Sequence, residues 1–295
     1  MMKIAVIGTL GKWSSESLAQ EIAALVGQCP LIEMSEVHLD LGQEKVMAQG
    51  HDLTQFDALV VKKVAQVYSP NALDRLETLR FLELRGVKVF SPVAGISRLI
   101  DRMSCTVTLA AGGIPMPETF ITESAEAAAQ RLAQYGKAVL KPLYSTKARG
   151  MVYLDAHKHG LKEVQEFQAA GNETLYLQRF VKGPGRDLGL SFLGGQYLGT
   201  YARVGNGDSW NSTTESGGVY RAEEPPEAWI ALAKRAQSLF PLDFTCVDLI
   251  ETEEGPKIFE VSAFGGFRGL KEALGLNVAA LYAKYVVEKT PQRKG

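Results

Sequence analysis

Strand-type and helix-type segments alternate from residue 3 to residue 90, and this alternation constrains the fold more than any other feature. Short apolar runs indicate strands, and apolar residues three and four positions apart indicate the helices between them. The expected strands are 3–8, 57–62 and 87–90, and the expected helices are 18–26, with Ser14 and Ser15 as caps, and 73–85. Consecutive strands that are joined through helices pair in parallel. Residues 1–95 are therefore predicted to form an N-terminal α/β domain around a small parallel sheet.

The pattern changes after a cluster of glycine and proline residues. A helix expected at 97–111 ends in Gly-Gly-Ile-Pro-Met-Pro at 112–117, a sequence that breaks regular structure. Strands and helices then alternate again, and hairpins follow, the first of them turning at Gly194 and Gly195. The predicted units after the first domain are a linking helix and joint at 96–117, a central α+β subdomain at 118–182 and a C-terminal α+β subdomain at 183–295.

Two acids occupy strand-type segments near the C-terminus. Asp248 belongs to the run CVDLIE and Glu260 to KIFEVS, and residues 252–256 between them have the composition of a hairpin turn. A buried acid is costly unless it is paired, protonated or bound to a metal. On adjacent antiparallel strands the two carboxylates would converge on one cation. An oxygen-only set without His or Cys suits Mg²⁺ bound to a nucleotide phosphate. The alternative is a pair of solvent-facing strand acids.

The charge balance gives no electrostatic basis for binding nucleic acid or an anionic membrane, because 32 basic residues face 33 acidic ones and the net charge is −1. No apolar run approaches the roughly 20 residues of a membrane-spanning helix, and the opening MMKIAVIG has strand character rather than that of a signal peptide. Cys29, Cys105 and Cys246 are scattered without a CxxC motif, which is typical of reduced thiols. We expect a cytoplasmic protein without a nucleic-acid or membrane partner.

Two segments carry groups suited to a nucleotide, and a third is rejected. Lys141 ends a strand in VLKP and precedes the basic loop 145–150, whose side chains and N–H groups can hold phosphate oxygens. Strand 174–180 runs into a Gly/Pro loop, and its backbone end could pair with an adenine edge. Each segment also fits an ordinary exposed lysine or an ordinary strand. Gly8-Thr-Leu-Gly-Lys12 lacks the GxxxxGK[ST] spacing of a phosphate loop, although its N–H groups could serve a substrate carboxylate.

The order and spacing of the short motifs is more specific than any one of them. Along the chain come Asp101-Arg102, Gly-Ile-Pro-Met-Pro, Val-Leu-Lys141-Pro-Leu, Leu-Gln178-Arg-Phe-Val, Gly185-Arg-Asp187-Leu, Tyr-Ala-Arg203, Val-Asp248-Leu-Ile and Glu260-Val-Ser262-Ala-Phe-Gly. This succession resembles the ATP-grasp superfamily, and within it the ribosomal-protein S6:glutamate ligase (RimK-like) branch, over nearly the whole chain. The resemblance implies an ATP-grasp fold with an N-terminal pre-ATP-grasp domain, ATP between two α+β subdomains, and ligation of a carboxylate to an amine.

The resemblance also implies a role for each matching residue. It places Lys141 between adenine and the α-phosphate, and it makes an adenine hinge, acting largely through backbone, of Gln178, Arg179, Phe180 and Val181. It places Asp187 at the ribose and Arg203 at the γ-phosphate and later at the acyl phosphate. It makes Asp248 and Glu260 ligands of Mg²⁺. Lys141 and Arg203 are thus the expected catalytic residues. Mn²⁺ is the alternative metal, and Glu260 is expected to bridge two ions.

Two departures from the family pattern concern phosphate contacts. The family's Asp-Lys is Asp101-Arg102 here, and the arginine keeps the charge while its planar fork changes the geometry. The flexible Gly-rich loop reads Ser-Thr-Lys-Ala-Arg-Gly at 145–150, with two glycines lost. Close backbone approach to phosphate becomes harder, because glycine reaches positive φ freely. Lys147 and Arg149 are expected to offset this loss with side-chain charge.

Three further departures concern the metal and the acceptor. Ser262 replaces an asparagine metal ligand and offers a smaller oxygen that can act through a water. Gly189 replaces an arginine that often lies two residues after the aspartate of Gly-Arg-Asp. The family's Asn-x3-Gly-Gly segment is longer here, at 211–218, and borders the acceptor pocket. The family's substrate is therefore not carried over to this chain where these changes fall.

The predicted function is that of an ATP-dependent carboxylate–amine ligase. A carboxylate attacks the γ-phosphorus, ADP leaves, and an amine displaces phosphate from the acyl phosphate to form an amide. The substrates would be a small-molecule or peptide carboxylate and an amine, with glutamate as the family default, and analogy favours a homo-oligomer. Two alternatives stay open: an ATP-binding regulator that lost its chemistry, which the lost glycines and Ser262 favour, and phosphorylation without ligation.

Overall fold

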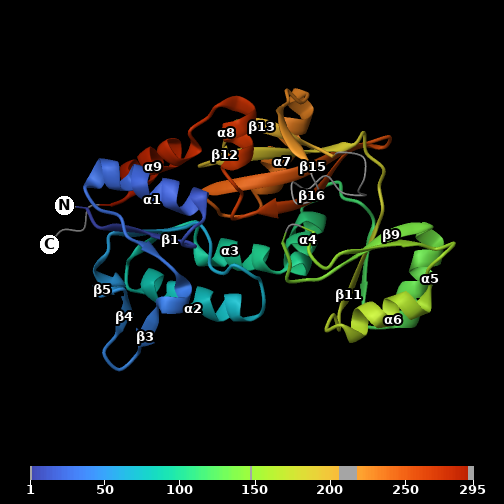
Figure 1. Ribbon diagram of the computed structural model, residues 1–295, viewed down its shortest axis with the longest axis horizontal. Coiled ribbons are helices and arrows are strands. Elements are labelled where there is room, and N and C mark those ends of the chain that lie inside the picture. Colours follow the sequence, from blue (N-terminus) through green and yellow to red (C-terminus); the bar gives the residue numbers. More distant parts are fainter. Residues whose placement is uncertain (1, 147, 206–217, 292–295) are drawn as a thin grey trace.

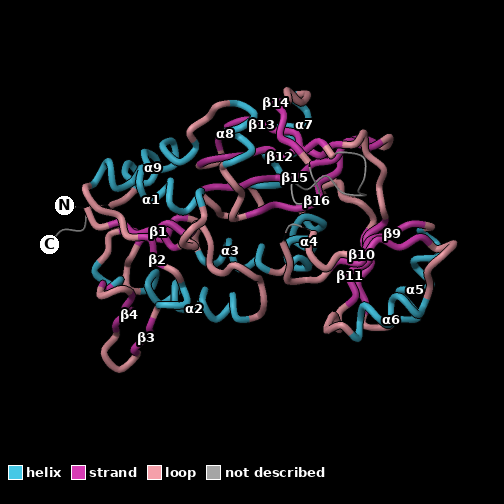
Figure 2. The backbone as a smooth tube through the Cα atoms, in the orientation of Figure 1, coloured by secondary structure: helices cyan, strands magenta, loops and turns pink. Residues whose placement is uncertain are grey.

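The structure, a computed structural model, describes residues 2–146, 148–205 and 218–291. Figure 1 shows the N-terminal domain at one end of the long axis and the central subdomain at the other, with the C-terminal subdomain along the top. The connections between the central subdomain and the rest of the chain are loops, one at 112–118 and one at 180–185 (Figure 2). Within the described ranges, no helix combines the length and the apolar character that crossing a membrane requires.

The N-terminal domain is built on the predicted parallel sheet. Its strand order is β2-β1-β6-β7, with β1 at Ile4–Ile7, β2 at Leu31–Ile32, β6 at Ala58–Val61 and β7 at Lys88–Phe90. Every residue of β1 and β6 is buried, as expected for a parallel sheet that is covered on both faces. Helices α1 (Trp13–Val26) and α2 (Asn71–Leu84) connect the strands.

Two local features of this domain differ from the sequence-based expectation. Ser14 and Ser15 do not cap α1, because the helix begins at Trp13 after Lys12; Ser15 Oγ instead accepts a hydrogen bond from the N–H of Thr9 (3.3 Å). A small sheet of β3 (His38–Asp40), β4 (Lys45–Ala48) and β5 (His51–Asp52) was not predicted. Its strands are short and β3 is exposed throughout, so no apolar alternation reveals them. Short 3₁₀ turns lie at Met34–Glu36 and Leu53–Gln55.

The prediction of a single helix at 97–111 is wrong. Two helices, α3 (Val93–Ile100) and α4 (Arg102–Ala111), meet at Asp101, whose backbone is extended (φ −96°, ψ 123°). The Asp101 carboxylate accepts the N–H of Met103 (2.9 Å) and so caps α4, which is the usual role of aspartate before a helix. The break places Arg102 in the first turn of α4, and its backbone N–H donates to the carbonyl of Leu143 (3.1 Å).

The central subdomain is a four-stranded antiparallel sheet with two helices on its outer side (Figure 1). The strand order is β10-β9-β11-β8, with β8 at Thr119–Thr122, β9 at Lys137–Lys141, β10 at Val152–Asp155 and β11 at Leu175–Arg179; the helices are α5 (Ala125–Tyr135) and α6 (Leu161–Ala169). Ala128, Leu132 and Leu177 belong to a hydrophobic cluster that contains buried residues of this subdomain alone. This part of the chain therefore has its own core.

The C-terminal subdomain holds a five-stranded antiparallel sheet of order β14-β13-β12-β15-β16. The strands are β12 (Arg186–Leu193), β13 (Gln196–Val204), β14 (Val219–Ala222), β15 (Phe244–Thr252) and β16 (Gly255–Ser262), and the helices are α7 (Glu227–Gln237), α8 (Arg268–Leu274) and α9 (Val278–Lys289). Helix α9 packs against α1 (Figure 1), and both remaining hydrophobic clusters mix residues of the first and last parts of the chain. These two parts form one packed body, and the predicted α/β architecture is confirmed, because a parallel sheet in the N-terminal domain is followed by antiparallel sheets.

Candidate functional site

A cleft of about 730 Å³ collects side chains from α4, the central sheet, the C-terminal sheet and the N-terminal domain. Its lining includes every predicted site residue within the described ranges, namely Arg102, Lys141, Gln178, Arg179, Phe180, Val181, Asp187, Arg203, Asp248, Glu260 and Ser262. Lys147 and residues 211–217 of the acceptor segment lie outside the described residues. The fold thus brings together positions that are up to 160 residues apart in the chain, as Arg102 and Ser262 are.

The two metal-candidate acids face each other across the β15–β16 hairpin. Asp248 is the register partner of Glu260, and Ser262 lies two residues further along β16, on the same face as Glu260. Among the described residues, no group of three or more His, Cys, Asp or Glu gathers where it could hold a metal. Two carboxylates and a hydroxyl fit Mg²⁺, which takes few protein ligands and completes its shell with phosphate oxygens and water. The Ser262 hydroxyl accepts the N–H of Phe264 (3.3 Å), so it is already oriented.

Arg203 is held between two acids. It pairs in register with Asp187 of β12, and its Nε donates to Asp187 Oδ2 (2.9 Å), an oxygen that its Nη2 also contacts. Nη2 lies 3.1 Å from Oδ1 of Asp248 as well. Burial opposes charge on the guanidinium, but the two carboxylates outweigh it and hold the pKa of Arg203 above its usual value. Asp187 therefore binds Arg203 in this structure, and its role at the ribose stays a prediction.

Burial dominates the ionisation of Asp248. The pKa of this carboxyl lies well above its usual range because of desolvation, an effect that Arg203 reduces and the charge of Glu260 increases. A carboxylate that is penalised in this way gains from a bound cation, since a metal supplies the compensating charge. The chemistry of the acid pair thus fits a cation site better than a pair of solvent-facing strand acids.

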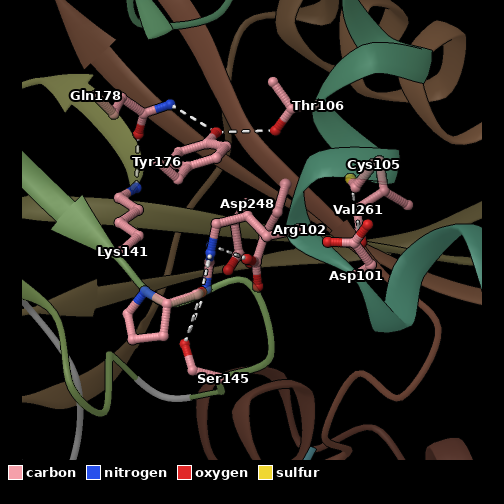
Figure 3. Close-up of polar contacts among 12 residues, drawn as sticks. Asp101, Arg102, Cys105, Thr106, Lys141, Ser145, Tyr176, Gln178, Asp248 and Val261 are labelled. Atoms are coloured by element: carbon pink, nitrogen blue, oxygen red, sulfur yellow. Dashed lines mark hydrogen bonds and ion pairs between the residues drawn. The ribbon is translucent and has the colours of Figure 1, made fainter. Parts of the chain in front are cut away.

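Lys141 is buried at the end of β9 and belongs to a chain of polar contacts (Figure 3). Its Nζ donates to Oε1 of Gln178 (2.6 Å), Nε2 of Gln178 donates to the Tyr176 hydroxyl (3.3 Å), and that hydroxyl lies 2.8 Å from Oγ1 of Thr106. Burial, followed by the charge of Arg102, lowers the pKa of Lys141 to about 7. The Gln178 side chain therefore orients the lysine, a contact that the sequence did not reveal.

Arg102 connects three elements of the site. Its Nη1 donates to Oε2 of Glu260 (3.1 Å), its Nη2 to Oγ of Ser145 (3.3 Å) and its Nε to the carbonyl of Pro142 (3.2 Å). Figure 3 shows the guanidinium between the acid-bearing strands and the loop after β9. A lysine could not make these divergent contacts, because they use the planar fork of arginine. The substitution of arginine for the family's lysine thus ties the metal acid to the phosphate loop.

The predicted adenine hinge is only partly open to a ligand. The N–H of Arg179 donates to the carbonyl of Glu118 (2.8 Å), and the N–H of Phe180 donates to the carbonyl of Lys137 (2.9 Å). The N–H of Val181 has no hydrogen-bond partner within the described ranges. The Arg179 side chain pairs with Glu118 (2.8 Å) at the surface. Of the four hinge residues, Val181 therefore offers the backbone donor that an adenine edge needs.

The loop after β9 shows the consequence of its lost glycines. Ala148 has φ +58° and Gly150 has φ +68°, both in the left-handed region. Glycine enters that region at little cost, whereas alanine places its Cβ close to the following carbonyl. The loop thus keeps a conformation that suits glycine while position 148 carries a side chain.

Gly189 is explained by a residue that the sequence analysis did not single out. A Cβ at Gly189 would lie 2.4 Å from Cζ and 2.6 Å from the hydroxyl oxygen of Tyr201, its register partner on β13. The buried Tyr201 ring thus covers the place of the family's arginine, and its hydroxyl lies 3.4 Å from Sγ of Cys246. The spacing in the sequence could have indicated this residue, because Tyr201 lies two residues before Arg203 and therefore lies on the same face of the strand as Arg203.

Lys62 was also missed. It directly follows β6 as a buried residue, and its Nζ donates to the carbonyl of Gly265 (2.6 Å), in the loop that follows Ser262. Burial, followed by the charge of Lys63, lowers the pKa of Lys62 to about 7. The N-terminal domain is thereby joined directly to the loop that leaves the metal-site strand.

The comparisons with known proteins agree with this geometry. The model of the RimK-like ATP-grasp domain matches residues 100–286. The tetrahydromethanopterin:alpha-L-glutamate ligase of Methanosarcina acetivorans is 28% identical over 265 residues, which cover 79% of this chain and 81% of that protein. A protein of Aliivibrio fischeri named "Probable alpha-L-glutamate ligase" is 27% identical over 301 residues, covering 99% of this chain and 97% of the relative.

Solved structures share the fold over almost the full length. The RimK domain protein ATP-grasp of Sphaerobacter thermophilus has a TM-score of 0.76 at 22% identity, over 96% of this chain and 98% of that one. The ATP-grasp ligase PsnB, solved with a phosphomimetic variant of its minimal precursor, Mg and ADP, has a TM-score of 0.77 at 17% identity, over 98% of this chain and 99% of that one. At these identities the likeness establishes the architecture.

Proposed function

Because the chain belongs to the RimK-like ATP-grasp family and is an ATP-dependent C–N ligase, we propose that it joins an L-α-amino acid, with L-glutamate as the first candidate, to a carboxylate of a small molecule or peptide. The observation that supports this most is the convergence of Lys141, Arg203, Asp248 and Glu260 on one cleft. The alpha-L-glutamate ligase relatives supply the candidate amino acid.

The proposed reaction proceeds through an acyl phosphate. The substrate carboxylate attacks the γ-phosphorus of ATP, the bond to the β,γ-bridging oxygen breaks, and ADP leaves; the amine then displaces phosphate and loses a proton. Arg203 faces the charge on the transferring phosphoryl group, and Lys141 holds the nucleotide phosphates. Asp248 and Glu260 would hold Mg²⁺, with Mn²⁺ as the alternative, and the metal would neutralise charge on the phosphate oxygens.

The nucleotide is proposed to lie between the central and C-terminal sheets. The N–H of Val181 would donate to the adenine edge, with Phe180 beside it and Gln178 fixing Lys141. Arg102 is proposed to leave Glu260 for a phosphate oxygen when the nucleotide binds, since both contacts use the same guanidinium. Asp187 would act by positioning Arg203.

The alternative of a regulator that only binds ATP is weaker, because such a protein has no need of Arg203 beside a metal acid. Phosphorylation without ligation would need the same residues and differs only in the acceptor. The buried, unpaired thiols of Cys105 and Cys246 suit a reducing compartment such as the cytoplasm. A homo-oligomer stays a prediction.

ADP release separates these possibilities. Wild-type protein with Mg²⁺ and ATP is screened against pooled carboxylates, with and without pooled amino acids, and the product is identified by mass spectrometry. A ligase sustains ADP release over many turnovers only when both pools are present, and it yields an amide; with the carboxylate alone it forms at most about one ADP per protein molecule. A kinase sustains ADP release without the amine. Absence of ADP in every combination would contradict the proposed function.

A further inference from the structure

The N-terminal domain forms one wall of the cleft through the segment after β6. Lys63 and Tyr68 of this segment line the cleft, beside Leu99 of α3 and Phe264 after β16. The residues assigned to nucleotide and metal come from α4, from the central sheet and the loop after β11, and from the C-terminal sheet. The N-terminal domain therefore contributes part of the lining of the same cleft.

The segment is fixed at three points. The backbone N–H groups of Lys62 and Lys63 both donate to the carbonyl of Ile7 (2.8 and 3.1 Å). Nη1 of Arg75 donates to the carbonyl of Val64 (2.7 Å), and Nζ of Lys62 donates to the carbonyl of Gly265 (2.6 Å). Such anchoring keeps the side chains of the wall in place before a substrate arrives, which lowers the entropic cost of binding.

The wall presents two hydrogen-bond donors against aromatic rings. Nζ of Lys63 donates to the Tyr68 hydroxyl (3.3 Å) and lies 4.5 Å from the centroid of its ring, and the ring meets Phe264 edge to face (6.2 Å). Burial raises the pKa of Tyr68, and the charge of Glu260 raises it further. The phenol thus stays protonated as a donor, and the wall lies within electrostatic reach of the metal-site acid. An ammonium and a hydroxyl in a partly apolar wall suit a carboxylate.

The carboxylate bound here should be one that does not react. The reacting carboxylate must reach the γ-phosphorus near Arg203 and the acids of the C-terminal sheet. An ion pair with Lys63 would stabilise the negative charge of that carboxylate before the reaction and so raise the barrier to its attack. A non-reacting carboxylate keeps the same contact throughout the reaction and orients the group attached to it.

We infer that Lys63 and Tyr68 bind the α-carboxylate of the incoming amino acid and direct its amine toward the acyl phosphate. The amine substrate is then an α-amino acid with a free α-carboxyl group, and neither a simple amine nor an amino-acid α-amide replaces it. This assignment rests on the proposed ligase reaction, in which the amide bond forms at that amine.

Binding can be measured without turnover. Protein saturated with Mg²⁺ and ADP is titrated with pooled common L-amino acids and with a matched pool of their α-amides, by saturation-transfer NMR, and then with L-glutamate and its α-amide singly. Wild type should prefer the acid. Lys63→Met should weaken binding of the acid about 10-fold or more and leave the α-amide unchanged, Tyr68→Phe should weaken the acid less, and Lys63→Arg should restore the preference. Lys45→Met, an exposed lysine of β4 outside the cleft lining, is the matched control.

The ratio of acid to α-amide binding decides the outcome. A lysine with only a structural role would weaken both ligands together, so an unchanged ratio in Lys63→Met would overturn the assignment. Equal binding of acid and α-amide by wild type, or binding of no amino acid, would overturn it as well. Failure of the ligase reaction is seen separately, as absence of ADP from wild type with every carboxylate and amine pool, whereas the binding ratio tests the subsite itself.

Discussion

Nη2 of Arg203 lies 3.1 Å from Oδ1 of Asp248, so the arginine expected at the transferring phosphoryl group contacts an acid expected at the metal. Arg102 and Glu260 repeat this relationship at the other acid, at 3.1 Å. Each metal-candidate carboxylate thus has a guanidinium partner within the cleft. Opposite charges that are paired in this way avoid the cost of isolated buried ions. A metal and a phosphate can replace these ion pairs, because the metal then pairs with the carboxylates and the phosphate pairs with the guanidinium groups.

Arg203→Ala should lower the rate of the chemical step by about 10²- to 10³-fold, because the charge that develops on the phosphoryl group loses its fixed partner. ATP binding should change much less, since the loss falls on the transition state. The measurement is single-turnover ADP formation at saturating Mg²⁺ and ATP with pooled carboxylates and amino acids.

The control for Arg203 is Arg221→Ala, an exposed arginine of the adjacent strand β14 outside the cleft lining, which should keep the wild-type rate. Because Arg203→Ala removes the guanidinium that Asp187 and Asp248 contact, circular dichroism must show that the variant is folded, and Arg203→Lys provides a milder change. Equal single-turnover rates in wild type and Arg203→Ala would contradict the assigned role.

Asp248→Asn and Glu260→Gln should each reduce Mg²⁺-dependent turnover about 10²-fold or more, while ATP binding without metal persists. The shape of each side chain is kept and only the charge that holds the cation is lost. Glu253→Gln, in the exposed turn of the same hairpin, is the control that should keep full activity. Mg²⁺-dependent turnover that survives both substitutions would make the acids ordinary strand residues.

Asp248→Asn should also raise the thermal stability of the ligand-free protein. The raised pKa of Asp248 means that its ionised form costs stability in the folded state, and this cost is fully present above that raised pKa. The gain should therefore be largest in mildly alkaline buffer and vanish below the ordinary carboxyl pKa of about 4, where Asp248 is protonated in both states. Melting temperatures across pH test this, and a gain that grows toward acid would contradict the sign.

The sequence predicted the elements that form the site better than the contacts within it. The apolar runs around Asp248 and Glu260 predicted a hairpin, and the register places the two acids opposite each other. By contrast, the pairing of Asp187 with Arg203 depends on strand register between β12 and β13, and the cover of Gly189 by Tyr201 depends on packing. The break at Asp101 was missed because apolar periodicity continues across it, whereas one capping side chain redirects the chain.

Nucleotide binding should be accompanied by uptake of a proton at Lys141. Its pKa is lowered from 10.5 to about 7, so at about pH 8.5 the free lysine is largely neutral, and a bound phosphate favours the charged form. Calorimetry in buffers of different ionisation enthalpy should therefore show proton uptake on ATP binding in this range. Lys141→Met should abolish the uptake and weaken ATP binding by roughly 1.5–3 kcal/mol.

Lys137→Met, an exposed lysine on the same strand, is the control that should keep both the uptake and the affinity. The same shift predicts that stability of the ligand-free protein rises with pH between 7 and 10.5, because the unfolded chain binds the proton that the folded lysine releases. Lys62 contributes in the same direction, so Lys141→Met should reduce this rise without removing it. ATP affinity that is unchanged in folded Lys141→Met would refute the assignment.

Ala148→Gly should be neutral or stabilising, unlike most substitutions to glycine. At φ +58° the alanine side chain costs about 1–2 kcal/mol, and its removal offsets the roughly 0.5–1 kcal/mol that glycine loses through the freedom of the unfolded chain. The matched control is Ala129→Gly in the interior of α5, where glycine should cost about 1 kcal/mol. The two variants should therefore differ by about 1–2 kcal/mol in the free energy of unfolding by urea. An equal loss of stability at both positions would mean that the loop bears no strain at Ala148.

Relief of the strain at Ala148 should also ease the approach of the loop backbone to phosphate, so Ala148→Gly is expected to bind ATP at least as tightly as wild type.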